Sequence, residues 1–206
     1  MGCSAEKPQQ GNVLDQYIAA GFVLPDSSEY ENDFEKKLFM AINVFRHEPK
    51  RYIPLVKKAY KEHILLKGSK TCPELVAKLQ TLESMTQVRF DGSANDACRQ
   101  NNADIVEKNE CVPEQGGNID KYRTITGDEK AGTCYEYTMV KYEGSEADAF
   151  LALELALEWN REGDDAKKSP LFEKDISLVG ISNKAHKTTI NVINILYVSA
   201  ATNAIE

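Results

Sequence analysis

The order of apolar and polar positions predicts several helices in the first half of the chain. Apolar residues recur at helical spacing over 34–45, after a cluster of capping residue types at 26–28. We expect a long helix to begin at this cluster and to end by Pro49, because proline cannot donate the helical hydrogen bond. The same spacing predicts three further helices, over 49–68, 73–85 and 94–110.

The second half of the chain alternates in a way that is typical of strands. Aromatic and β-branched residues alternate with polar ones over 133–142, and β-rich runs over 175–182 and 188–200 are separated by the polar turn 183–187. The last run is apolar on both faces. A strand of that kind needs a layer of structure on each side of its sheet.

A helix is expected over 145–163, with Ser145 as its N-cap. This helix is apolar almost all round, and we interpret its narrow polar stripe as a solvent-exposed edge formed by Glu154, Glu158 and Arg161. The segment 111–129 is rich in turn-forming residues and reads mainly as a loop, with room for one helical turn.

These elements predict an α/β fold, a three-layer α/β/α sandwich with a central, mainly antiparallel sheet flanked by helices. The chain has 206 residues, which suits one domain, and we place it at 26–206 behind a polar leader at 1–25.

The charge and composition of the chain exclude some classes of binding partner. The net charge of −7 disfavours nucleic acid, and no apolar run is long enough to span a membrane. The first residues lack the apolar core of a secretory signal, so we expect an intracellular chain whose five cysteines are mostly reduced thiols. The oligomeric state is left open.

The start of the chain, MGCS, can be read as a lipidation signal. Removal of Met1 would free the amine of Gly2 for myristoylation, and Cys3 offers a thiol for palmitoylation. Residue 6 is glutamate where the motif favours serine or threonine, so a plain polar leader is the alternative. Two acyl chains would anchor the chain at a membrane surface.

Three segments, taken in order, resemble the CAP superfamily of cysteine-rich secretory, antigen 5 and pathogenesis-related proteins, in particular its SCP-like domains. They are Asn43-x-x-Arg46 at the end of an early helix, the run GTCYEYTMVKYEGSEADAF, and SPLFEKDISLVGIS with the closing TTINVINILYV. The resemblance covers about residues 30–199 and implies the family's α/β/α sandwich.

In many members of that family, a cleft with two histidines and two acidic residues can hold a divalent metal. The resemblance places Glu136 and Glu158 at the acidic positions and Lys167 near the second histidine position, and no histidine falls in the cleft. We therefore expect no metal, no cofactor and no catalytic residue. Asn43 and Arg46 are interpreted as structural residues near a helix end.

Two functions follow as expectations. The first is a non-catalytic CAP-like binding module that engages a lipid, a membrane surface or a protein partner. The second is a structural or scaffolding protein of a cytoskeletal or ciliary assembly. A metal-dependent hydrolase is a distant third.

Overall fold

A computed structural model of the chain describes residues 12–113, 116–127, 133–161 and 169–199. Its longer helices and its strands are α1 (Val13–Ala19), α2 (Asp33–His47), α3 (Ile53–Glu62), α4 (Cys72–Thr81), α5 (Gly92–Lys108), α6 (Gly117–Thr126), α7 (Ala147–Trp159), β1 (Arg89–Phe90), β2 (Cys134–Val140), β3 (Ile176–His186) and β4 (Ile190–Ser199). Short 3-10 helices lie at η1 (Ser27–Glu29), η2 (Pro49–Tyr52), η3 (Ile64–Leu66) and η4 (Pro170–Phe172).

The four strands form one mixed sheet in the order β1-β3-β4-β2. The hairpin of β3 and β4 and the pair of β2 and β4 are antiparallel, whereas the two-residue strand β1 runs parallel to β3. The three predicted strands are therefore present, and the parallel edge strand β1 makes the sheet mixed where a mainly antiparallel one was expected.

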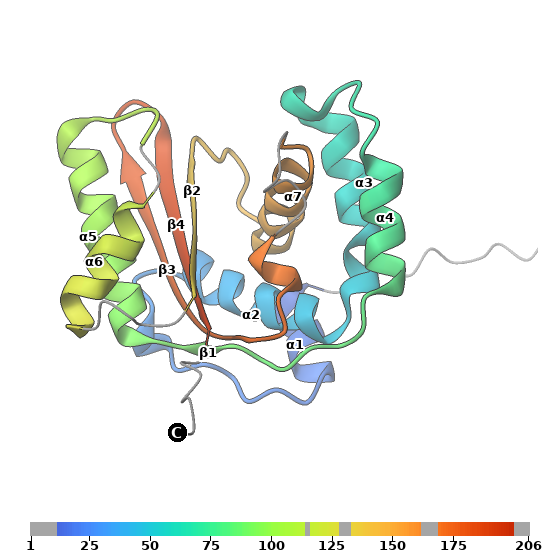
Figure 1. The fold of residues 1–206 in the computed structure, drawn as a ribbon, viewed down its shortest axis with the longest axis horizontal. Helices are drawn as coiled ribbons and strands as arrows, with labels where there is room; N and C mark the ends of the chain where they lie inside the picture. Colours follow the sequence, from blue (N-terminus) through green and yellow to red (C-terminus); the bar gives the residue numbers. More distant parts are fainter. Residues whose placement is uncertain (1–11, 114–115, 128–132, 162–168, 200–206) are drawn as a thin grey trace, which may run out of the picture.

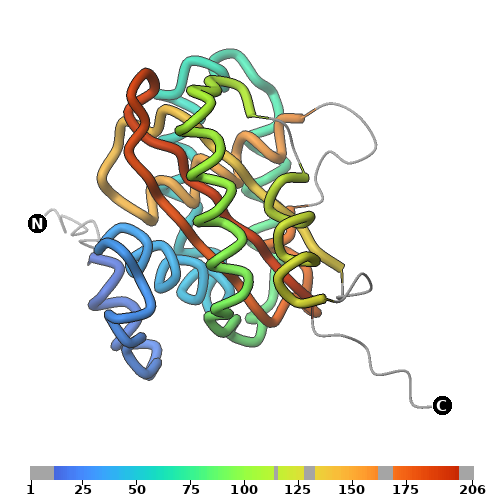
Figure 2. Tube along the Cα trace, turned by 90° about the vertical axis from the view of Figure 1, so that its left-hand side faces the viewer, coloured from blue at the N-terminus to red at the C-terminus, as the bar shows by residue number. Residues whose placement is uncertain are grey.

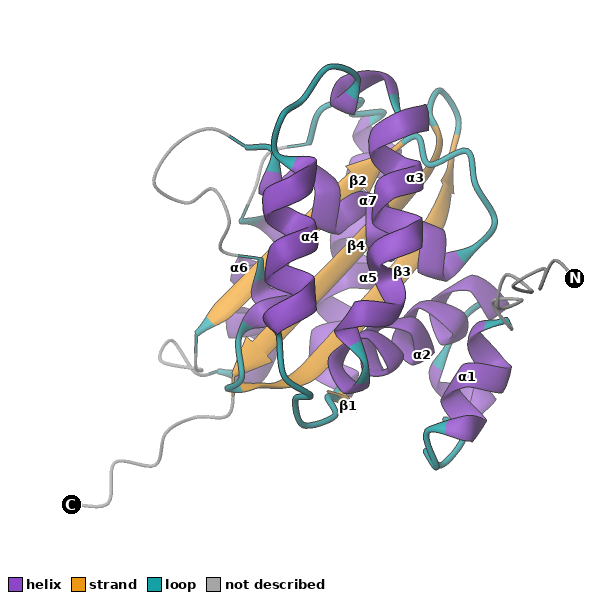
Figure 3. Cartoon of the chain, turned by 90° about the vertical axis from the view of Figure 1, so that its right-hand side faces the viewer, coloured by secondary structure: helices purple, strands orange, loops and turns teal. Residues whose placement is uncertain are grey.

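Helices cover both faces of this sheet, which confirms the predicted α/β/α sandwich (Figure 1). One face carries α5 and α6, and Figure 2 shows α5 lying across β3 and β4. The other face carries α2 and α7. Outside α7 lie α3 and α4, so that α7 is covered both by the sheet and by a further pair of helices (Figure 3).

The position of α7 explains its composition. A helix buried on opposite sides must be apolar around most of its circumference, and nine of its thirteen residues are buried. The main core joins α7 to α2 and to the inner face of the sheet, through side chains such as Phe45, Phe150 and Tyr197.

The helix α5 packs unusually close to β3, and Gly180 makes this approach possible. A Cβ atom at that position would lie 2.2 Å from the backbone carbon of Ala94. The Asn95 side chain strengthens the contact, since its Oδ1 accepts a hydrogen bond from the backbone N–H of Ile181 at 3.0 Å.

Several predicted helix ends were wrong. Asn32 is the N-cap of α2 and accepts a hydrogen bond from the backbone of Glu35, whereas Asp26 caps the separate η1. The helix predicted over 49–68 divides into η2, α3 and η3, and α4 ends at Thr81. Glu146, not Ser145, is the N-cap of α7.

Two segments predicted as irregular are ordered elements. The polar turn predicted at 183–187 was wrong, because β3 continues to His186 and the hairpin turn lies at 187–189. The predicted loop 111–129 contains the ten-residue helix α6. Its side chains are mostly polar because only one side of it faces the protein.

The expected leader 1–25 includes part of the packed domain. Val13 and Tyr17 of α1 are buried in the main core, and α1 packs on α2. Of the helices in the described part of the chain, none has the length and the apolar composition that spanning a membrane requires.

Candidate functional site

Arg46 lies near the end of α2 with its guanidinium in the protein interior, where the residue is 1% exposed. Its three nitrogens donate hydrogen bonds to the carbonyl oxygens of Thr86 at 2.8 Å, Glu173 at 2.9 Å and Ile176 at 3.1 Å. One side chain thus fixes the segment before β1, the segment after η4 and the start of β3. This is an architectural role.

Asn43 is one helical turn before Arg46 and is also fully buried. Its Nδ2 donates to the carbonyl of Phe39 at 3.3 Å, and its Oδ1 accepts from the backbone N–H of Val88 at 2.9 Å. Both members of the Asn-x-x-Arg pair therefore hold the chain that leads into β1.

Glu136, an expected cleft residue, is the anchor of α6. Its carboxylate accepts backbone N–H groups from Gly116, Asn118 at 2.9 Å and Ile119 at 3.3 Å. The amides of the first turn of a helix lack partners within the helix and carry partial positive charge, so a carboxylate is stabilised there. Glu136 therefore stabilises the start of α6, on the α5–α6 side of the sheet.

The burial of Glu154 differs from the prediction. We interpreted this residue as part of a solvent-exposed edge, but it is 0% exposed, because its side of α7 packs on the sheet, where it meets Tyr197 of β4. The hydroxyl of Tyr197 donates to its Oε1 at 3.1 Å, and its Oε2 has no hydrogen-bond partner among the described residues. Burial and then the neighbouring Glu158 raise the pKa of Glu154 well above its ordinary value.

Glu158 lies one turn beyond Glu154, and its Oε1 pairs with Arg161 at 3.0 Å. Burial raises the pKa of Glu158, and Arg161 opposes this. Successive side chains of a strand point to opposite faces. Tyr137 packs against Phe150 of α7, so its neighbour Glu136 faces away from α7. The sheet separates Glu136 from Glu158, and the two acids share no cleft.

The remaining candidates are scattered or lie outside the described residues. Gly2, Cys3 and Lys167 belong to the latter group. His47 ends α2, His63 follows α3, and His186 ends β3. Within the described ranges, no three histidine, cysteine, aspartate or glutamate side chains are grouped so as to hold a metal ion. Cys72, Cys98, Cys111 and Cys134 are free thiols.

A groove between α3 and α7 brings together residues that were not predicted as a site. Two pockets, of about 250 and 610 Å³, share the lining residues Glu62, His63, Tyr142 and Leu153. We call this the α3–α7 groove. Its other apolar lining residues include Leu55, Ala59, Ile64, Leu65, Met139, Ala149 and Leu157.

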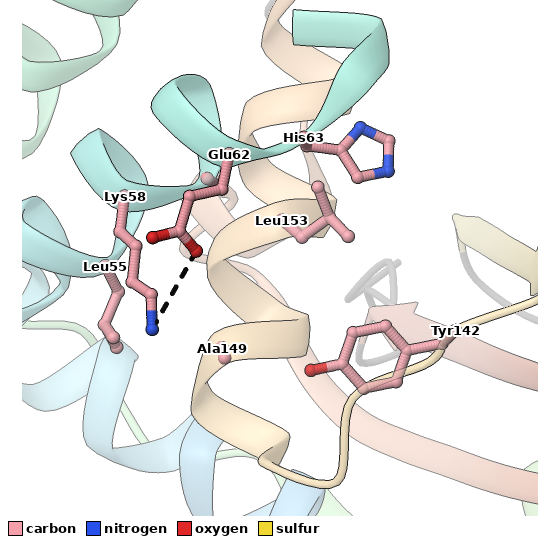
Figure 4. A pocket seen from close by; sticks show the side chains of 8 residues that line it. Leu55, Lys58, Glu62, His63, Tyr142, Ala149 and Leu153 are labelled. Atoms are coloured by element: carbon pink, nitrogen blue, oxygen red, sulfur yellow. Dashed lines mark ion pairs between the residues drawn. The ribbon is translucent and has the colours of Figure 1, made fainter.

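Figure 4 shows how three elements form the groove. Leu55 and Glu62 project from α3, Ala149 and Leu153 from α7, and Tyr142 comes from the segment after β2. Tyr142 is held in place because its hydroxyl donates to the carbonyl of Glu146 at 2.9 Å and its ring packs edge-on against Phe150, 5.0 Å between centroids. The groove wall is therefore preformed.

Charged and polar groups lie at both edges of the groove, with Lys58, Glu62 and His63 on α3 and its C-cap, and Lys141 and Glu143 in the segment after β2. Lys58 pairs with Glu62 at 4.0 Å across one turn of α3. His63 caps the end of that helix, and its Nδ1 is buried without a hydrogen-bond partner in the described part of the chain. An apolar floor with a few polar groups at its edges is the usual form of a ligand site. The spacing of apolar residues predicted a helix over 49–68, but no sequence signal marked this region as a groove.

Comparisons with known proteins add little to this geometry. No family model matches the chain, and no curated protein matches it. One solved structure, an outer surface protein from Borrelia burgdorferi, is similar at 14% identity with a TM-score of 0.40, over 71% of this chain and 92% of that one. A likeness at this level carries no conclusion about function. The resemblance to the CAP superfamily stays a prediction.

Proposed function

We propose that the protein is a non-catalytic binding module that holds the aliphatic chain of a lipid in the α3–α7 groove. The observation that carries this proposal is the continuous apolar lining shared by the two pockets, from Leu55 to Leu157. Ligand pockets commonly have volumes of about 300 to 1,000 Å³, and the larger pocket is about 610 Å³.

The form of the groove suits a chain with one polar end. Aliphatic and aromatic carbons line the floor, where removal of a ligand's methylene groups from water supplies the favourable free energy, about 0.8 kcal/mol for each buried methylene. The rim offers Lys58 and the unpartnered Nδ1 of His63 to a polar group. A carboxylate or phosphate at the end of the chain would suit these groups.

The carboxylates suggested by the family resemblance support a non-catalytic role. Glu136 binds the first turn of α6, and Glu158 pairs with Arg161 near the end of α7. Neither lines the α3–α7 groove. A carboxylate fully engaged by backbone amides has little freedom to act as a general base.

Fluorescence titration with a naturally fluorescent polyene fatty acid tests the proposal. We expect saturable binding to the wild-type chain and a loss of at least about tenfold in affinity for Ala149→Phe, because the new ring would occupy the smaller pocket. Ala77→Phe is the matched control, since Ala77 is an exposed helical alanine on α4 outside the groove.

Thermal melting of both variants must show that they remain folded. Equal affinity of Ala149→Phe and Ala77→Phe would contradict the assignment of the groove. Absence of saturable binding to the wild-type chain would contradict the function itself and would favour the scaffolding alternative.

A further inference from the structure

Two aliphatic side chains project into solvent at the end of α3. Ile64 is 71% exposed and Leu65 is 69% exposed, although they are adjacent and both belong to η3. The next residue, Leu66, is 1% exposed and anchors η3 in the core. Single exposed apolar residues are ordinary, but a protruding pair held at its base by a buried leucine forms a defined apolar tip.

This tip is presented by a rigid turn. The backbone N–H of Leu66 donates to the carbonyl of His63 at 3.0 Å, and that of Ser69 donates to the carbonyl of Leu66 at 3.1 Å. The chain then returns at Thr71, whose hydroxyl bonds Tyr60 at 2.8 Å and Asn160 at 3.2 Å. The loop that carries the tip is therefore tied to α3 and to the end of α7.

The segment that carries the tip is rich in positive charge, and Glu62 and Glu143 are the acidic residues that line the same pocket as the tip. The segment 50–70 contains seven lysine and arginine residues and one glutamate, a net charge of +6 in a chain whose net charge is −7. The side chains that flank the tip are all exposed: Lys57, Lys58, Lys61, Lys67 and Lys70. The rest of the chain is correspondingly acidic, so the molecule is strongly polarised.

We infer that Ile64, Leu65 and the surrounding lysines dock the protein on the surface of an anionic lipid bilayer. Lysines near such a surface attract it electrostatically, and aliphatic side chains gain by entering the boundary between headgroups and acyl chains. A nucleic acid would satisfy the lysines but would leave both aliphatic side chains in water. The acidic remainder of the chain is repelled by the same surface, which orients the tip toward it.

Vesicle sedimentation of the full chain tests this inference. Every variant carries Gly2→Ala and Cys3→Ser, so that acylation cannot contribute. We expect sedimentation with vesicles of equal parts phosphatidylcholine and phosphatidylserine, and little with phosphatidylcholine alone. Raising the salt concentration should weaken binding, because exposed charges are then screened.

Two sets of variants separate the apolar contribution to vesicle binding from the electrostatic contribution. The double variant Ile64→Ser, Leu65→Ser should lose at least about tenfold in vesicle affinity. Lys61→Gln and Lys67→Gln should each lose about fivefold. The matched control is Val23→Ser, Leu24→Ser, which removes an equally adjacent apolar pair, 88% and 50% exposed, from the segment after α1; it should bind like the parent chain.

Four results would overturn the inference. The first is equal binding to neutral and anionic vesicles, and the second is an equal loss of vesicle affinity in the Val23→Ser, Leu24→Ser control. The third is no sedimentation of the parent chain, which carries only Gly2→Ala and Cys3→Ser. The fourth is binding of RNA or an acidic protein in place of vesicles. Ala149→Phe should sediment normally even if it no longer binds the fatty acid, since Ala149 lines the smaller pocket, whereas Ile64 and Leu65 lie at the edge of the larger pocket only. Loss of sedimentation in that variant would also contradict docking by the tip.

Discussion

Glu154 should make the protein less stable as the pH rises above the ordinary carboxyl range. The residue is 0% exposed, its Oε1 accepts one hydrogen bond from Tyr197 at 3.1 Å, and its Oε2 has no partner among the described residues. Burial, and then repulsion by Glu158, raise the pKa of Glu154 well above its ordinary value, whereas the Tyr197 hydrogen bond and Arg161 act in the opposite direction.

The sign of the effect follows from proton linkage. Unfolding gives Glu154 an ordinary pKa of about 4.3, so the unfolded chain loses this proton while the folded chain keeps it. The folded state then binds more protons, and the free energy of unfolding falls with rising pH. The slope approaches about 1.4 kcal/mol for each pH unit between the unfolded pKa and the raised folded pKa.

Glu154→Gln preserves the shape and the acceptor for Tyr197 but cannot ionise. We expect urea denaturation to show that the variant gains stability relative to wild type by about 1 kcal/mol between pH 5 and pH 6. Glu107→Gln, at an exposed position on α5, is the control and should show no such change. A constant difference between Glu154→Gln and wild type over this interval would refute a buried, protonated Glu154.

Two further substitutions test the architecture. Arg46→Met should lower the free energy of unfolding by about 3 to 5 kcal/mol, because it leaves one buried and two part-buried carbonyl groups without their donor; a loss below about 1 kcal/mol in chemical denaturation would contradict that role. Gly180→Ala should prevent normal folding or cost several kcal/mol, because its Cβ would meet the backbone of Ala94 at 2.2 Å, whereas Gly92→Ala has open space and should be tolerated in the same melting assay. Equal melting temperatures for these two glycine variants would show that α5 does not pack on β3 in this way.

The sequence predicted the layers of the fold better than the limits of its elements. Alternation in β2 and the doubly apolar β4 correctly indicated a covered sheet, and β4 is buried from Val192 to Ser199. The capping residue of α2 was missed, although Asn32 and Glu35 have the spacing of a capping box. Glu35 also accepts the backbone N–H of Asn183 at 2.7 Å, a long-range contact that no local pattern reveals.

Local sequence patterns could not predict the candidate site, because contacts between segments that are distant in the sequence form it. Glu154 and Glu158 have the spacing of an exposed stripe, and only the packing of α7 on the sheet, against Tyr197, buries Glu154. Glu136 stands out in the sequence as a carboxylate within an otherwise apolar strand, but its partners belong to α6, a helix whose polar composition resembled a loop. The α3–α7 groove depends on three separate segments, and its apolar residues read as ordinary core.

Mapping amide and methyl chemical shifts during titration with a saturated fatty acid would test the α3–α7 groove most directly. We expect saturable chemical-shift changes at four residues that line the groove, Leu55, Ala59, Leu153 and Leu157. Chemical shifts in α5 and α6, on the far face of the sheet, should change little. Shifts concentrated in α5 and α6, or no saturable shifts at all, would contradict binding in the α3–α7 groove.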